Sequence, residues 1–272
     1  MVLVIVSFLL AEKSFAQEPS PSPMPTPAFD YERAYQDYNY TFNLYTQAHT
    51  EYVASKEAYL SYQTLSAKAD AQDKTLKMLQ LRDEVARTYL TAIRMRLAEA
   101  TGITNYEQNS LYLKLDDEVA WYANHREKLT SAGSLEDLTA TGNEFVGEYK
   151  TTEVLTYQAL GMVVIGKEKS LRLRLKDQIS AVRSKVASLR NGTNNDKANK
   201  VERWLLEAEN KIARSEEKEN SFLASLNKLR LENNNKTQTY YSQEFTLEDA
   251  NQYLKESNSD IKESLRELAA YD

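Results

Sequence analysis

Large apolar and aromatic side chains recur along residues 30–100 in steps that alternate between four and three. This spacing places them along one side of an α-helix and is typical of helices that pair side by side. The pattern therefore predicts a helix with an interaction surface on that side. Its first half holds seven residues that we call the aromatic seam: Tyr35, Tyr38, Phe42, Tyr45, His49, Tyr52 and Tyr59.

The phase of this pattern slips between Tyr59 and Leu65 and then resumes as far as Ala100. Because neither Gly nor Pro occurs in residues 30–100, we expect one continuous helix, roughly 105 Å long. The slip is then a local overwinding of the kind that a three-residue shift produces in a coiled coil. The alternative is a turn in the polar run at 66–73, which would fold the second half back onto the first.

Four further helices are predicted in the rest of the chain. All five Pro residues lie between Pro19 and Pro27, so no later segment contains this helix breaker. Glycines and polar runs mark the expected turns, and the helices are expected at about 105–130, 135–190, 196–232 and 246–271. The predicted fold class is all-α, an elongated antiparallel long-helix bundle with coiled-coil (heptad) character, spanning residues 29–272.

The expected helices at 135–190 and 196–232 should form an antiparallel hairpin. If the turn is centred on Thr193, the numbers of facing residues sum to roughly 386, because both helices rise equally per residue. Val163, inside an apolar run, then faces Leu223. The basic run at 167–176 faces a series of glutamates at 209–219. Both matches follow from one assumed turn, which favours the hairpin.

The start of the chain has the pattern of an exported protein. Residues 1–16 are expected to be a signal peptide, because a short apolar run is followed by small residues at Ser14 and Ala16, before the expected cleavage site. No basic residue precedes the apolar run, so a start further upstream or an uncleaved hydrophobic tail are alternatives. Residues 17–28 form a Pro/Ser-rich linker. We expect a secreted or extracytoplasmic protein of the cell envelope, with no membrane span in the mature chain.

Composition and charge exclude several kinds of site. The net charge is −6 with both signs interspersed, which argues against a nucleic-acid partner. The chain has no Cys, so disulfides and thiolate metal sites are ruled out. Neither His49 nor His125 has an acid three residues before it, as a two-metal helical bundle requires. The acids at 116–118 near His125 are expected to be a solvated helix face, and no catalytic, cofactor or metal site is predicted.

These observations favour a non-enzymatic structural or interaction protein, acting as a helical coiled-coil spacer or adaptor. If residues 30–100 form one helix, the aromatic seam has no obvious partner within the chain, so we expect a protein partner or a second copy to cover it. The alternative function is a cell-wall or surface-polymer binding module. Tyr side chains suit that function because each offers an apolar ring face and a hydroxyl group to a glycan.

Overall fold

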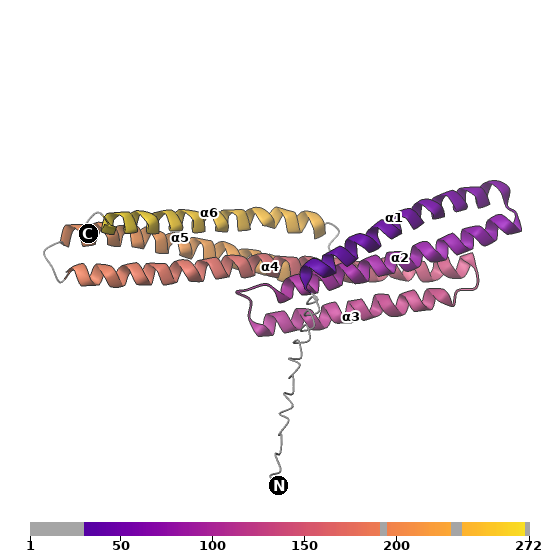
Figure 1. Ribbon diagram of the computed structural model, residues 1–272, viewed down its shortest axis with the longest axis horizontal. Coiled ribbons are helices and arrows are strands. Elements are labelled where there is room, and N and C mark those ends of the chain that lie inside the picture. Colours follow the sequence, from indigo (N-terminus) through magenta and orange to yellow (C-terminus); the bar gives the residue numbers. More distant parts are fainter. Residues whose placement is uncertain (1–29, 191–194, 230–235, 270–272) are drawn as a thin grey trace, which may run out of the picture.

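The structure is a computed structural model that describes residues 30–190, 195–229 and 236–269 (Figure 1). Within these ranges the chain is all-α with no strand, which confirms the predicted bundle of long helices. The expected signal peptide at 1–16 and linker at 17–28 lie outside the described residues. The helices are α1 (Tyr31–Tyr62), α2 (Leu65–Ala98), α3 (Asn105–Thr130), α4 (Leu135–Arg190), α5 (Asn195–Lys228) and α6 (Lys236–Ala269).

The longest helix, α4, is shared by two bundles that lie end to end (Figure 1). Its first half packs with α2 and α3, and α1 lies on α2. Its second half packs with α5 and α6. Buried apolar side chains continue from one bundle to the next along α4, from Leu138 through Leu155, Val163 and Ile165 to Val186. The molecule is therefore an elongated rod in which one helix runs through both parts.

The single helix predicted for residues 30–100 is wrong, because the chain turns at Gln63 and Thr64. Gln63 adopts a left-handed conformation (φ 50°), and its N–H donates to the Tyr59 carbonyl at the end of α1. The Thr64 hydroxyl then accepts from the Ala67 N–H and caps α2. The phase slip near Tyr59 therefore marks a turn, as in the alternative interpretation, but just before the polar run at 66–73.

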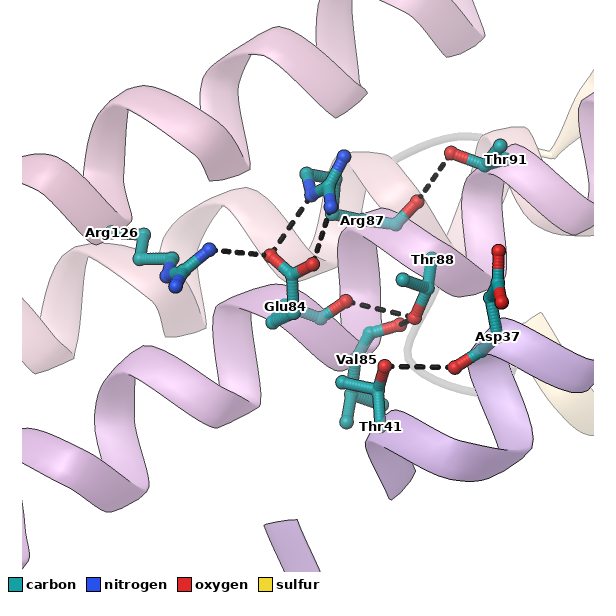
Figure 2. Close-up of polar contacts among 8 residues, drawn as sticks. All are labelled: Asp37, Thr41, Glu84, Val85, Arg87, Thr88, Thr91 and Arg126. Carbon is teal, nitrogen blue, oxygen red and sulfur yellow. Dashed lines mark hydrogen bonds and ion pairs between the residues drawn. The ribbon is translucent and has the colours of Figure 1, made fainter. Parts of the chain in front are cut away.

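A row of small residues explains why α1 folds back onto α2. Every seventh residue of α1 is buried and small: Ala34, Thr41, Ala48 and Ser55. The hydroxyl of Thr41 donates to the carbonyl of Asp37, and that of Thr88 on α2 donates to the carbonyl of Glu84 (Figure 2). These polar groups are satisfied within their own helices, so both can be buried where the two helices meet.

The predicted hairpin of α4 and α5 is present. Leu223 packs against the apolar cluster that contains Val163, and Gly161 lies directly against the Leu226 side chain. Arg172 forms ion pairs with Glu216 and with the buried Glu219. The facing residues therefore follow the predicted register closely, with the apolar and charged sections opposite each other as expected.

The last helix begins earlier than expected, at Lys236 rather than near residue 246. The polar residues from Asn233 to Ser242 predict a loop before this helix. In the structure the Tyr240 ring stacks on Tyr157 of α4, with centroids 4.8 Å apart, and lies edge-on to Phe222 of α5. These aromatic contacts hold the first turns of α6 against the other two helices.

The two bundles meet where the loop after α2 touches α4. Gly102 has a left-handed φ of 77°, and the loop backbone lies directly on Gly166. A Cβ atom at Gly166 would overlap the carbonyl oxygen of Thr101. The glycine at 166 is therefore required for the close approach of two backbone segments.

Replacing Gly166 with alanine should reduce the free energy of unfolding by about 1–3 kcal/mol, because the added methyl group overpacks a contact with backbone. The matched control is Gly147→Ala on the same helix. No atom lies within 4 Å of a Cβ placed there, so this change should stabilise the protein by about 0.5–1 kcal/mol through helix propensity alone. Urea denaturation followed by circular dichroism measures both. Equal effects of the two substitutions would contradict the close contact at Gly166.

Candidate functional site

The aromatic seam forms the edge of the α1–α2 interface. The larger row, Tyr38, Tyr45, Tyr52 and Tyr59, is half-buried beside the small buried residues of α1. Tyr35, Phe42 and His49 are exposed, and Phe42 keeps 46% of its surface accessible. The structure thus brings all seven predicted residues onto one side of α1, but it leaves part of each row accessible to solvent.

Neighbouring rings of the seam touch along the helix. The centroids of Tyr35 and Tyr38 are 6.0 Å apart, as are those of Tyr38 and Phe42. The ring of His49 lies 5.9 Å from Tyr45 and 6.0 Å from Tyr52. These contacts restrict the side-chain rotamers, so the rings present faces of fixed orientation to solvent. A ligand that stacks on them loses little of its binding energy to ordering the protein.

Part of the seam opens into a groove between α1, α2 and α4, with a cavity volume of about 580 Å³. We call it the aromatic groove. Polar groups enter it from Arg82 of α2 and from Glu153 and Thr156 of α4. Six rings from the three helices line it: Tyr38, Tyr45, Tyr89, Phe145, Tyr149 and Tyr157.

Contacts among the lining residues hold the walls in place. The ring of Tyr38 lies 5.1 Å from that of Tyr89, which joins α1 to α2. Phe145 stacks on Tyr149, with an interplanar angle of 13°. The guanidinium of Arg82 lies 3.8 Å from the centre of the Phe145 ring, and its Nη2 donates to the Gly142 carbonyl at 3.1 Å. This cation–π contact joins α2 to α4 beneath the groove.

Behind the groove, Asp83 of α2 and His125 of α3 form a buried pair. The His125 Nδ1 lies 2.6 Å from Asp83 Oδ2, and its Nε2 donates to the Thr141 carbonyl at 2.9 Å. Trp121 stacks on the imidazole with centroids 4.7 Å apart. Burial raises the pKa of Asp83, although His125 and Arg82 oppose the shift. With both ring nitrogens and one face engaged, His125 holds three helices together rather than acting on a ligand.

A second buried cluster surrounds Thr152 of α4, a residue that also lines the groove. The Thr152 hydroxyl donates to Glu118 Oε2 at 2.6 Å and lies 2.8 Å from the Tyr122 hydroxyl. Burial raises the pKa of Glu118 to about 7, and the neighbouring carboxyl of Glu148 contributes in the same direction. Burial also raises the pKa of Tyr122. A carboxyl group whose pKa is raised to about 7 is therefore buried behind the groove, where it contacts the lining residue Thr152.

On its other side, α2 is tied to α3 by ion pairs. Glu84 accepts from Arg87 of its own helix and from Arg126 of α3, the latter at 2.9 Å (Figure 2). Burial alone would raise the pKa of Glu84, but the two guanidinium groups outweigh it, and the pKa is lowered. This cluster fixes α2 against α3 and leaves the opposite side of α2 to form the groove.

Sequence reasoning identified the α1 side of this site and missed the α2 and α4 sides. Asp83 falls in the predicted apolar row of residues 30–100, and an acid in such a row requires a buried partner. That signal could have indicated a buried partner for Asp83, which in the structure is His125. Phe145 and Tyr149 show the helical spacing of a shared face, but nothing in the sequence aligns that face with the seam.

Comparison of the chain with known protein families, with curated proteins and with solved structures finds no match. Within the described ranges, no group of three or more potential metal-ligating side chains has the geometry to hold an ion. Of the helices described, none combines the length and apolar character needed to cross a bilayer. The aromatic groove and the exposed part of the seam are the surfaces that suit a binding function.

Proposed function

We propose that this chain is an exported, non-enzymatic interaction protein of the cell envelope or exterior, which acts as a rigid helical spacer or adaptor. The observation that carries the proposal is the aromatic surface of α1. Tyr35 and Phe42 are exposed beside Tyr38 and Tyr45, which line a groove formed with two other helices. Exposed aromatic side chains held in fixed orientation are typical of surfaces that bind a partner.

The rod supports the spacer role. With 56 residues, α4 is roughly 84 Å long. The aromatic surface belongs to the bundle around its first half, so the bundle of α5 and α6 extends away from it (Figure 1). A protein of this shape would hold what binds to the first bundle at a fixed distance from whatever carries the far end of the second bundle.

The expected self-association depended on a continuous first helix with an uncovered seam. Because α2 packs against α1 within the same chain, a second copy is no longer needed to cover it. The exposed row of Tyr35, Phe42 and His49 remains as the contact surface, and we propose that it binds a component of the envelope.

The experiment that tests this proposal compares two apolar-to-lysine changes in the native host. Phe42→Lys alters the exposed row, whereas Leu113→Lys alters a residue of α3 that is 69% exposed and lies outside the groove lining. We expect Phe42→Lys to lower the amount of protein retained by washed envelopes at least about fivefold, since a central contact residue contributes more than about 1 kcal/mol. Leu113→Lys should be retained like the parent.

Mass analysis of the same retained protein tests the export part of the proposal, because cleavage after Ala16 leaves Gln17 as the first residue. An intact Met1, or equal retention of both lysine variants and the parent, would contradict the proposal.

A further inference from the structure

We propose that the aromatic groove between α1, α2 and α4 binds a neutral oligosaccharide, whose sugar rings stack on the aromatic side chains. This inference rests on the proposed function and names the ligand class of its binding surface. It follows from the size of the groove, from its chemistry and from its charge.

Size favours a small chain over a helical partner. The cavity of about 580 Å³ lies within the range of roughly 300–1,000 Å³ for ligand pockets. A helix is about 10 Å across, so only part of it would enter a groove of this volume. The α4 wall extends from Phe145 to Leu160, roughly 22 Å at the helical rise. The groove is therefore long and shallow, which suits an extended chain of several sugar rings.

The lining chemistry matches a sugar ring on both of its surfaces. Five of the six rings in the groove are tyrosines, and one is Phe145. A pyranose ring has a face of C–H groups and an edge of hydroxyl groups. The tyrosine faces contact the C–H groups, while the phenol hydroxyls, Thr156 and Glu153 provide hydrogen-bonding groups for the edge.

Charge favours a neutral ligand. Among the described residues that line the groove, the one cationic side chain is Arg82. It is already engaged by the Phe145 ring and the Gly142 carbonyl, and its Nε lies 3.9 Å from Asp83. The one acid in the lining is Glu153. Because these charges are opposite and equal in number, the described lining carries no net charge. The described part of the lining thus offers an anionic polymer no free cation.

The rings that would stack on the ligand are positioned in advance. Tyr38 is held by Tyr89, and Tyr149 by Phe145. Tyr149 nevertheless keeps 51% of its surface accessible, so a ligand can reach its ring. Tyr149 is therefore the residue to change, because its removal affects binding more than folding.

The test uses the full mature chain on an array of neutral and acidic oligosaccharides, followed by calorimetric titration with neutral tetrasaccharides, chitotetraose and cellotetraose among them. We expect a neutral oligosaccharide to bind with a Kd below about 1 mM. Tyr149→Ala should raise that Kd at least about fivefold by removing one stacking contact. Tyr149→Phe keeps the ring and should retain most of the affinity. Tyr106→Ala changes a tyrosine of α3 that is 84% exposed and outside the groove, and it should bind like the parent.

Failure to retain any neutral oligosaccharide overturns this inference, and so does binding that Tyr149→Ala leaves unchanged. Tighter binding of an acidic oligosaccharide overturns the charge argument and with it the ligand class. If these assays fail while envelope retention still depends on Phe42, the interaction function stands and only the saccharide is wrong. If retention is also independent of Phe42, both are wrong.

Discussion

Replacing Val163 with aspartate should destabilise the protein by more than about 4 kcal/mol, in the range that only a few mechanisms reach. Val163 is 5% exposed and packs in an apolar cluster with Leu155, Ala159 and Leu223. An aspartate there buries a charge that has no partner, and the group must either remain desolvated or take up a proton. The substitution lies where α4 passes from one bundle to the other, so both are affected.

The matched control is Val146→Asp, which makes the same change on the same helix where the side chain is 57% exposed. Its effect should stay within about 0.5 kcal/mol. Thermal unfolding followed by circular dichroism separates the two, since several kcal/mol correspond to a fall in Tm of about 10 °C for a chain of this size. A Val163→Asp protein that melts within about 2 °C of the parent would show that this part of α4 does not face α5.

Replacing Glu118 with glutamine should make the protein more stable at pH 8 and remove a pH dependence. The pKa of Glu118 is raised from 4.5 to about 7 in the folded protein, so the folded state holds this proton more tightly than the unfolded state. The resulting stability is fully present below pH 4.5 and is lost as the pH rises through about 7. Glutamine keeps an uncharged group beside Thr152 and Glu148 and does not lose that stability.

At pH 8 the gain from Glu118→Gln should approach about 3 kcal/mol, the equivalent of the shift at 1.36 kcal/mol per pKa unit. It should shrink toward zero as the pH falls to about 4.5. Urea denaturation at a series of pH values measures it. Glu127→Gln, on the exposed side of the same helix, is the control and should follow the parent at every pH. A Glu118→Gln protein with the parent's pH profile would show that Glu118 is not the titrating group.

Much of the fold follows from patterns that act within a single helix. The apolar run around Val163 and the basic run after it predict both the α4–α5 hairpin and its register. Gly133 interrupts the helical pattern between α3 and α4, and this local signal predicts where α4 begins. These features are visible in the sequence because each depends on the pattern of one helix, or on the patterns of two helices that follow each other in the chain.

The turn between α1 and α2 could not be predicted from local sequence patterns. Gln63 adopts a left-handed conformation that glycine favours. Because the residue there is neither Gly nor Pro, the sequence contains no helix breaker at the turn. Its cause is the fit between a row of small side chains on α1 and the surface of α2, which is a tertiary contact. The aromatic side chains dominate the periodic pattern, yet the residues buried at the interface are Ala34, Thr41, Ala48 and Ser55.

The candidate site was predictable to the extent that it lies on one helix. The seven seam residues share a side of α1, but the groove also needs Arg82 and Tyr89 of α2 and a face of α4. Their alignment depends on how far α2 and α4 are shifted along each other, which Gly142 and Gly166 set by close packing. No pattern within one helix contains that information.

Two glycines of the continuous helix α4 lie at the point where a rod of this kind would most easily hinge. Gly161 and Gly166 lie where the helix passes from one bundle to the other, and glycine is the residue that restrains a helix least. The Leu226 side chain packs directly against Gly161, and the Thr101 backbone packs directly against Gly166. Both glycines are therefore held by tertiary contacts. Bending α4 toward Leu226 or toward Thr101 would cause a steric clash. Bending it away would break a packed contact. We therefore expect the two bundles to keep one orientation relative to each other instead of hinging at these glycines.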